Sequence, residues 1–463
     1  MIMRQNIQAN GITEGVIWKQ LLVFFFPILL GTFFQQLYNT VDAIIVGQFV
    51  GKEALAAVGG PTGTLINLLV GFFVGLSSGA TVIISQYYGA GKPDETSKAV
   101  HTATALSLAG GAVIMAIGLI FSPLALKAMG TPDDIMNYSV IYIRVYFCGM
   151  IPNLIYNMGS GILRAVGDSK RPLYFLIVCC IVNVVLDLLF VLVFKLGVLG
   201  AALATILSQL ISAILVLVTL IRSVSMFQLN IREIRFTGSI LKSIIQIGIP
   251  AGLQSIMYSM SNIIIQASIN QFGTDTIAAW TAYSKIDGLF WMIMGAFGIA
   301  ITTFTGQNFG AKKIDRVRKS VVVCLGMAFG TALGLSGILL LSGQYIYGLF
   351  TQDAAVLKIG MDILHTLVPF YFTYVCIEIF SGAVRGAGDS LIPTIITCVG
   401  VCALRVIWIL AVEAFRPTLT MVIISYPISW SLTSLCFVGY YLQGGWLRRR
   451  MKVAGFTKDT ISS

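Results

Sequence analysis

The stretch RAVGDSKRP, from Arg164 to Pro172, occurs again as RGAGDSLIP from Arg385 to Pro393, so the two copies begin 221 residues apart. A second pair of stretches has the same offset: QYYGAGK begins at Gln86, and QNFGAKK begins at Gln307. Two matches in one register indicate an internal duplication. We therefore expect two halves with the same number and order of secondary-structure elements.

The composition places the chain in a membrane. Of its 463 residues, 57% are hydrophobic and 11% are charged, whereas soluble domains have roughly 45–50% and about 25%. The phosphate-binding motif GxxxxGKS/T is missing from the sequence, so we expect no ATP hydrolysis. The eight cysteines lie in apolar runs without CxxC spacing, and the two histidines are isolated. This pattern favours small core residues over metal ligands.

Apolar stretches of about 20 residues are long enough to cross a bilayer, and here glycine, proline and charged residues separate them. We expect twelve membrane-spanning helices, at residues 18–49, 54–86, 98–121, 138–160, 172–194, 197–221, 241–271, 276–307, 318–342, 359–381, 393–413 and 418–443. The predicted fold is an all-α integral membrane protein of two six-helix bundles. The bundles are residues 1–222 and 240–463, with a cytoplasmic linker at 223–239 and a basic cytoplasmic tail.

The charged residues predict how the helices are oriented. Because each repeat contains six helices, both RxxGDS motifs face the same side, and the halves are parallel repeats about an axis along the membrane normal. The side that holds these motifs and both termini carries 22 of the 30 basic residues, against five on the opposite side. The positive-inside rule therefore places both termini on the cytoplasmic side of an inner or plasma membrane. This topology and contact with anionic membrane lipids explain the net charge of +11 without nucleic acid.

Five oxygen-bearing side chains are expected at one depth of the first bundle. Asp42 lies ten residues, roughly 15 Å of helix, before Lys52 at the outer end of the first span. Asp187 lies eight residues, roughly 12 Å, before Lys195 at the outer end of the fifth span. Tyr38 and Asn183 each lie one turn deeper, four residues before an aspartate. Thr205, eight residues into the sixth span, reaches the same depth.

This set of oxygens suits a hard cation or a proton, and the two carboxylates give the site a charge that changes on loading. An acidic residue inside a membrane costs about 2.5–3.5 kcal/mol on insertion scales, so a pair of them indicates a function. The same side chains could instead be hydrogen-bonded contacts between helices. Thr205 could also bond only the backbone of its own helix.

Four features of the sequence are specific in combination: the duplicated six-helix plan, the paired RxxGDS motifs, the GAGK-type loops after spans 2 and 8, and YNTVDAIIVGQFVG from Tyr38. In this combination nearly the whole chain resembles the MATE (multidrug and toxic compound extrusion) transporters. The resemblance implies export of bulky, often cationic organic compounds, coupled to H+ or Na+, by two lobes that rock around a central cavity. We expect a monomer that is not an enzyme and that needs no cofactor besides the coupling ion.

The DinF-like branch of that family implies roles for particular residues, because its coupling site uses a Tyr-x-x-x-Asp pair on span 1, an Asn-x-x-x-Asp pair on span 5 and a threonine on span 6. The matching residues here are Tyr38, Asp42, Asn183, Asp187 and Thr205. The NorM-like branch uses a glutamate on span 7, but residues 244–272 contain no acid, which favours the DinF-like branch. The second half offers instead a possible site of Asp287, Glu378 and Arg405, in which Glu378 and Arg405 could neutralise one another.

Polar and aromatic side chains on spans 1 and 4 are predicted to line the substrate cavity. Besides Tyr38 and Asp42 they are Gln35, Asn39, Asn153, Tyr156 and Asn157. Such a surface suits planar organic cations, although each residue could serve only to pack helices. Arg164 and Arg385 are interpreted as caps of helix ends in the cytoplasmic turns.

Two other functions fit parts of the sequence. A flippase for lipid-linked saccharides belongs to the same superfamily, but it would need more spans or a strongly cationic cavity, and only three basic residues lie within the spans. A membrane-embedded aspartyl protease is the enzyme alternative, because Gly386–Asp389 reads GAGD, a match to GxGD. That match lies in a turn before a proline and has no Tyr-Asp partner. The choice between H+ and Na+ and the physiological substrate stay open.

Overall fold

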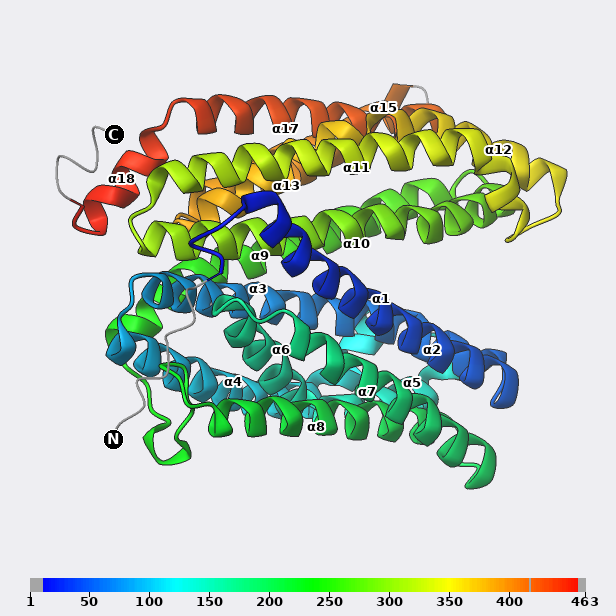
Figure 1. Cartoon of the computed structure of the whole chain (residues 1–463). Coiled ribbons are helices and arrows are strands. Elements are labelled where there is room, and N and C mark those ends of the chain that lie inside the picture. The colour runs from blue at the N-terminus through cyan, green and yellow to red at the C-terminus, as the bar shows by residue number, and fades with distance from the viewer. Residues whose placement is uncertain (1–10, 416–417, 457–463) are drawn as a thin grey trace. The chain divides into compact units, whose positions relative to one another are not determined.

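The computed structural model describes residues 11–415 and 418–456, and every regular element in these ranges is a helix (Figure 1). In this part of the chain eleven helices are long and apolar enough to cross a membrane. A bent pair, α5 (Asp133–Cys148) and α6 (Met150–Ala165), makes a twelfth span with a 50° bend. The prediction of an all-α membrane protein with twelve spans is confirmed.

Packing divides the chain into two compact units. Unit 1 is Met1–Leu22 with Leu253–Ser463, and unit 2 is Val23–Gly252. Both boundaries fall inside long helices, α1 (Ile17–Phe49) and α9 (Gly238–Asn270), and not in the linker. These units are defined by which residues pack together. The predicted division into two bundles, with a linker at residues 223–239, is defined by the sequence repeat and stays a prediction.

Unit 2 contains the first six spans. Two clusters of buried apolar side chains form its core. One includes side chains of α1, and the other includes side chains of the linker and of α9. After α1 its elements are α2 (Lys52–Gly59), α3 (Pro61–Gly89), α4 (Pro93–Ala128), α5, α6, α7 (Lys170–Asp187), the π-helix η1 (Leu188–Val193), α8 (Val198–Arg222), the 3-10 helix η2 (Ile231–Glu233) and the first part of α9.

Glycines allow α9 to pack closely against α3. Gly75 and Gly79 of α3 face Gly252 and Gly248 of α9, so each helix presents two glycines four residues apart. A Cβ atom at Gly79 would lie 2.8 Å from the backbone nitrogen of Gly248, closer than a larger residue allows. Since lipid supplies no hydrophobic force between helices, close backbone packing of this kind joins them. This contact explains why the first part of α9 belongs to unit 2.

The linker between the halves is irregular apart from η2 and is attached to unit 2. Phe227 and Leu229 are buried in the core beside α4. The backbone N–H of Asn230 donates to Nε2 of His101 on α4 at 3.0 Å. His101, which is isolated in the sequence, therefore serves to anchor the linker.

Unit 1 contains the other six spans. Figure 1 shows α18 in red at the end of α17, where the chain turns away from the bundle. The elements after α9 are α10 (Thr274–Gly310), α11 (Ile314–Gly348), α12 (Ala354–Leu367), η3 (Val368–Phe370), α13 (Tyr371–Gly386), α14 (Leu391–Thr397), the π-helix η4 (Cys398–Ala403), α15 (Leu404–Phe415), α16 (Leu419–Ile423), α17 (Ser425–Leu442) and α18 (Gly445–Val453).

One arginine attaches the first described residues to unit 1. The guanidinium of Arg316, on α11, donates to the backbone oxygens of Ile12, Glu14 and Gly15 and to Oε1 of Gln20, at 2.7–3.1 Å. Hydrogen bonds from a charged group contribute more than neutral ones do. The segment that leads into α1 is therefore held at the end of α11.

The predicted orientation can be tested at exposed positions beside the repeated motifs. Lys170 and Leu391 are exposed at the starts of α7 and α14. In a background without native cysteines, Lys170→Cys and Leu391→Cys should resist an impermeant thiol reagent added to intact cells and react after permeabilisation. Gln352→Cys, in the exposed loop between α11 and α12, should react in intact cells. Labelling of only one of the first two cysteines in intact cells would refute the parallel repeat.

Candidate functional site

The two aspartates predicted for the first bundle are both buried within unit 2. Asp42, on α1, is 6% exposed, and Asp187, the last residue of α7, is 0% exposed. The two carboxylates lie close enough for the charge of one to act on the other. Among the described residues, Oδ1 of Asp42 and both carboxylate oxygens of Asp187 have no hydrogen-bond partner. A buried polar atom without a partner costs free energy, so this pair requires an explanation.

The other residues predicted for this site are also buried in unit 2, but their hydrogen bonding differs. Asn183, one turn before Asp187, has no partner for either side-chain polar atom in the described structure. Tyr38 is 6% exposed on α1. The hydroxyl of Thr205 donates to the carbonyl of Ala201 on its own helix at 3.0 Å. The structure thus gives Thr205 the backbone bond that the sequence left open as an alternative.

Sequence reasoning missed three residues beside this site. Tyr142, on α5, is close enough to Asp42 and Asp187 for the charge of their carboxylates to act on it, and it stacks on Tyr146 with ring centroids 6.3 Å apart. The third residue is Gln209, on α8. It adjoins Tyr38 of α1 and Tyr146 of α5, and its Oε1 has no hydrogen-bond partner in the described structure. Its place one turn after the span-6 threonine, at the depth predicted for Tyr38 and Asn183, was a usable signal.

A π-helix begins directly after the aspartate on α7. In η1 the backbone bonds run to the fifth residue along, as from the N–H of Phe194 to the carbonyl of Leu189 at 2.9 Å. Such segments are rare and often occur at functional sites, because they shift the register of the following side chains. The second bundle has a π-helix in its own fifth span, η4, which ends two residues before Arg405.

The oxygen atoms at the site suit H+ or Na+ better than a transition metal. Its unpartnered acceptors are carboxylate and amide oxygens of Asp42, Asp187 and Asn183, and hard cations prefer such ligands. In the described part of the chain no three His, Cys, Asp or Glu side chains are grouped so that they could hold a metal ion. A proton or a sodium ion bound here would provide the partner that the buried carboxylates lack.

The residues predicted for the substrate cavity fall into two groups. Gln35 and Asn39 are exposed on α1. On α6, Nδ2 of Asn157 donates to the backbone and side-chain oxygens of Asn153, both at 2.9 Å. The hydroxyl of Tyr156 donates to a backbone carbonyl at the start of α7 at 3.2 Å. The α6 residues therefore have packing partners, whereas those on α1 are available for contact.

The carboxylate of Asp287 in the second bundle is fully partnered. It accepts hydrogen bonds from the Tyr371 hydroxyl at 2.6 Å, the Trp291 indole at 2.6 Å and the Tyr283 hydroxyl at 3.3 Å. The ring of Tyr371 stacks on Phe290 with centroids 4.0 Å apart, which holds its hydroxyl in place. The Asp287 carboxylate thus has hydrogen-bond donors around it, which the Asp187 carboxylate lacks in the described structure.

The structure does not pair Glu378 with Arg405. The guanidinium of Arg405 lies 3.9 Å from the ring centre of Tyr426 and donates to the Ser429 hydroxyl at 3.2 Å. The carboxylate of Glu378 accepts a hydrogen bond from the Tyr374 hydroxyl at 3.2 Å. No ion pair joins Glu378 to Arg405 in the described ranges. The proposed mutual neutralisation is therefore wrong, because each group has another partner.

The prediction that Arg385 caps a helix end is also wrong, whereas the same interpretation of Arg164 stays a prediction. Arg385 donates to Oε1 of Gln254 on α9 at 3.1 Å. A long side chain that leaves a helix end tilts back toward the N-terminus of its helix, so Arg385 enters the bundle. Asp168 makes the cap in the first motif, where its Oδ1 accepts the first two N–H groups of α7 at 3.1 Å.

Comparisons with known proteins agree with this architecture. The MatE family model matches residues 27–189 and 250–410, one stretch in each half. A probable multidrug resistance protein of Bacillus subtilis, YoeA, is 27% identical over 94% of this chain and 95% of its own length. The multidrug export protein MepA of Staphylococcus aureus is 23% identical over 82% of this chain and 84% of its own.

Two solved structures have the same fold. A crystal structure described as MATE in the straight conformation matches with a TM-score of 0.88 and 23% identity, over 96% of this chain and 99% of that chain. A MOP superfamily transporter from Pyrococcus furiosus matches with a TM-score of 0.86 and 23% identity, over 94% and 97%. At these identities the likeness concerns the fold alone.

The contrast between the two carboxylates predicts opposite effects on stability. Asp287→Asn should lower the free energy of unfolding by about 1–3 kcal/mol, since an amide nitrogen then faces donors that need an acceptor. Asp187→Asn should be neutral or stabilising, because it removes a buried carboxylate without partners. Thermal unfolding of both variants in one detergent measures the difference. A larger loss of stability for Asp187→Asn would show that Asp187 is the structural residue of the two.

Proposed function

Because this chain belongs to the MatE family of membrane transporters, we propose that it exports bulky, often cationic organic compounds in exchange for H+ or Na+. Proteins of this family are transporters and not enzymes. The observation that carries the proposal is the pair of buried carboxylates, Asp42 and Asp187, whose oxygens lack hydrogen-bond partners in the described structure. The similarity to a probable multidrug resistance protein and to a multidrug export protein supports this class of substrate.

Asp42 and Asp187 are the groups that take up the coupling ion in this proposal, and Asn183 adds a neutral amide oxygen beside them. Uptake of H+ or Na+ removes negative charge from the interior of unit 2, where an uncompensated carboxylate is costly. The ion therefore changes the relative free energies of two conformations, and only that difference can drive transport. Tyr142 and Gln209 lie beside Tyr38 and complete the polar surroundings of the carboxylate pair.

The exposed polar residues of α1 link this site to the substrate. Gln35 and Asn39 are exposed on the same helix that carries Asp42, within seven residues of it. A cationic substrate near them would use the negative charge of the unloaded carboxylates as a counter-charge. Ion uptake removes that charge. Substrate and coupling ion therefore compete for the negative charge of the same carboxylates, although they bind at different places.

The orientation and assembly that we propose rest on charge and on the family. Both termini lie on the cytoplasmic side of the cell membrane, because the basic residues are concentrated on the side that holds the termini. The working unit is a monomer, since one chain contains both bundles. The match to GxGD reflects a structural turn: Asp389 accepts a hydrogen bond from the Tyr440 hydroxyl at 3.2 Å and lies 4.0 Å from Arg449. These contacts leave it no role in proteolysis.

Neutral variants of the carboxylate pair test the coupling site. Asp42→Asn and Asp187→Asn should each abolish ion-driven export in everted vesicles, because the amide keeps the shape but cannot take up the ion as a charged group does. Asp362→Asn, at an exposed position on α12, is the matched control and should transport normally. Asp287→Asn should have the milder effect on transport per folded molecule. If Asp287 is essential and Asp42 dispensable, the coupling site lies in the second bundle.

Equilibrium binding tests the competition between ion and substrate. A fluorescent organic cation bound to the purified protein should lose affinity as pH falls if the ion is H+, or as sodium rises if it is Na+. By linkage, the substrate must weaken ion binding by the same factor. Asp42→Asn should abolish the dependence. An affinity that stays flat in both titrations, or a dependence that survives in Asp42→Asn, contradicts the mechanism.

A further inference from the structure

A basic cavity lies at the start of α11 in unit 1. Its volume is about 350 Å³, and Ile17 of α1 forms part of its wall. The rest of the wall is Ile314 with four basic side chains and one acidic side chain: Lys312, Lys313, Arg316, Lys319 and Asp315. A concave surface with this excess of positive charge suits an anion, and the first N–H groups of a helix favour one further.

Two of the four cations are already used, and two are available. Arg316 holds the segment before α1, and Nζ of Lys313 donates to the carbonyl of Thr13 at 2.9 Å. Lys312 and Lys319 are exposed, and neither forms an ion pair in the described ranges. Both ammonium groups line the cavity without an acidic partner in the described structure, so both are available to a bound anion.

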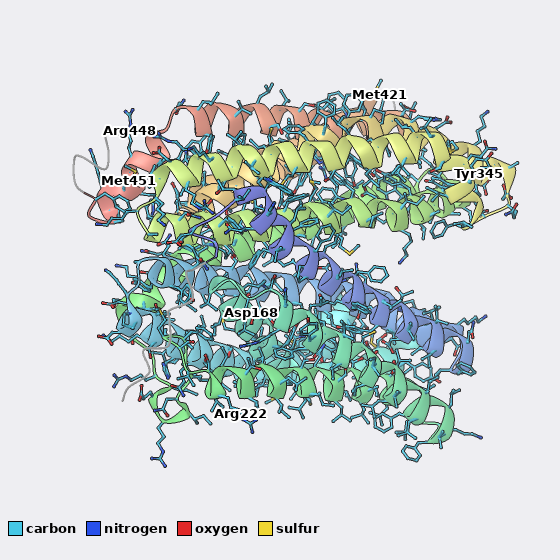
Figure 2. All side chains as sticks on the ribbon, in the orientation of Figure 1. Asp168, Arg222, Tyr345, Met421, Arg448 and Met451 are labelled. Carbon is cyan, nitrogen blue, oxygen red and sulfur yellow. The ribbon has the colours of Figure 1, made fainter. Side chains whose placement is uncertain are left out.

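A basic amphipathic helix adjoins this cavity. On α18, Trp446 and Met451 are buried against α10 and α11, whereas Arg448 and Lys452 are exposed. Nζ of Lys312 lies 5.5 Å from the ring centre of Phe456, just after α18, and so connects the helix to the cavity. Figure 2 shows Arg448 and Met451 at one end of unit 1 and Tyr345 at the opposite end. The basic groups are thus gathered at one end of the bundle.

The face of α11 beyond the cavity is apolar and exposed. Lys319 shares this face with Val322, which is 67% exposed, and with Leu333, which is 57% exposed. In a membrane-spanning helix such a stripe contacts lipid chains. A molecule that fits both parts has an anionic head at Lys319 and apolar chains along α11. A phospholipid has this form, whereas free phosphate can occupy only the cavity.

We propose that this cavity binds the phosphate headgroup of an anionic phospholipid, with Lys312 and Lys319 as its charged contacts and the apolar face of α11 as the surface for its chains. Basic pockets between membrane helices and basic amphipathic helices at the interface bind such headgroups. The site lies wholly in unit 1, apart from the carboxylate pair of unit 2. It is therefore independent of which ion the transporter uses.

Lipid binding to the purified full-length protein tests the proposal by native mass spectrometry. Wild type should retain dioleoylphosphatidylglycerol in preference to dioleoylphosphatidylcholine, with an affinity that falls as salt rises. Lys312→Gln with Lys319→Gln should weaken phosphatidylglycerol at least about tenfold, since each lysine near an anionic headgroup contributes about fivefold. Lys312→Arg with Lys319→Arg should keep the binding. The lysines are exposed, so the melting temperature should not change.

The sequence repeat supplies a matched control. Lys92→Gln with Lys98→Gln removes the same charge at exposed positions of unit 2, and these positions lie 221 residues before Lys313 and Lys319. This control should leave phosphatidylglycerol binding within twofold of wild type. An equal loss in both double variants would show a general electrostatic effect and overturn the proposal. Displacement of the lipid by millimolar inorganic phosphate would overturn it too, because the site would then recognise a soluble anion.

Discussion

A buried carboxylate in a membrane bundle needs a partner from within the protein, because the surrounding lipid offers none. The two bundles meet this constraint differently. In the second, Asp287 accepts three hydrogen bonds from aromatic side chains. In the first, Asp42 and Asp187 lie close together with oxygens that have no partner in the described structure. The first bundle is consequently able to gain free energy from a cation, whereas the Asp287 carboxylate of the second already has its partners.

The two bundles differ in this way although they share one duplicated architecture. Both halves keep the RxxGDS turn, and in the second half the arginine of that turn, Arg385, reaches Gln254 inside its own bundle. Both halves also interrupt their fifth span with a π-helix, η1 or η4. One π-helix follows an aspartate and the other precedes Arg405. A repeat can therefore preserve backbone architecture while the charges placed on it diverge.

The ends of unit 1 show how a membrane bundle uses cationic side chains for structure as well as orientation. Arg316 orders the segment that enters α1, and Arg450 of α18 donates to the carbonyl of Ala387 in the RxxGDS turn at 3.1 Å. In that turn Gly388 has a φ of 95° and packs directly against the guanidinium of Arg450, which a side chain would obstruct. The positive charges that predict topology in the sequence thus also join helix ends to one another.

The sequence by itself determined the architecture: twelve apolar stretches, the 221-residue repeat and the depth of Asp42 and Asp187 follow from hydropathy and counting, since a span must match the bilayer. Only the tertiary structure decided which polar groups have partners. Spacing along one helix cannot show that Tyr371 reaches Asp287, that Arg405 lies over Tyr426 rather than beside Glu378, or that Gln209 adjoins the site. Those contacts join different helices, and their partners depend on how the helices pack and rotate.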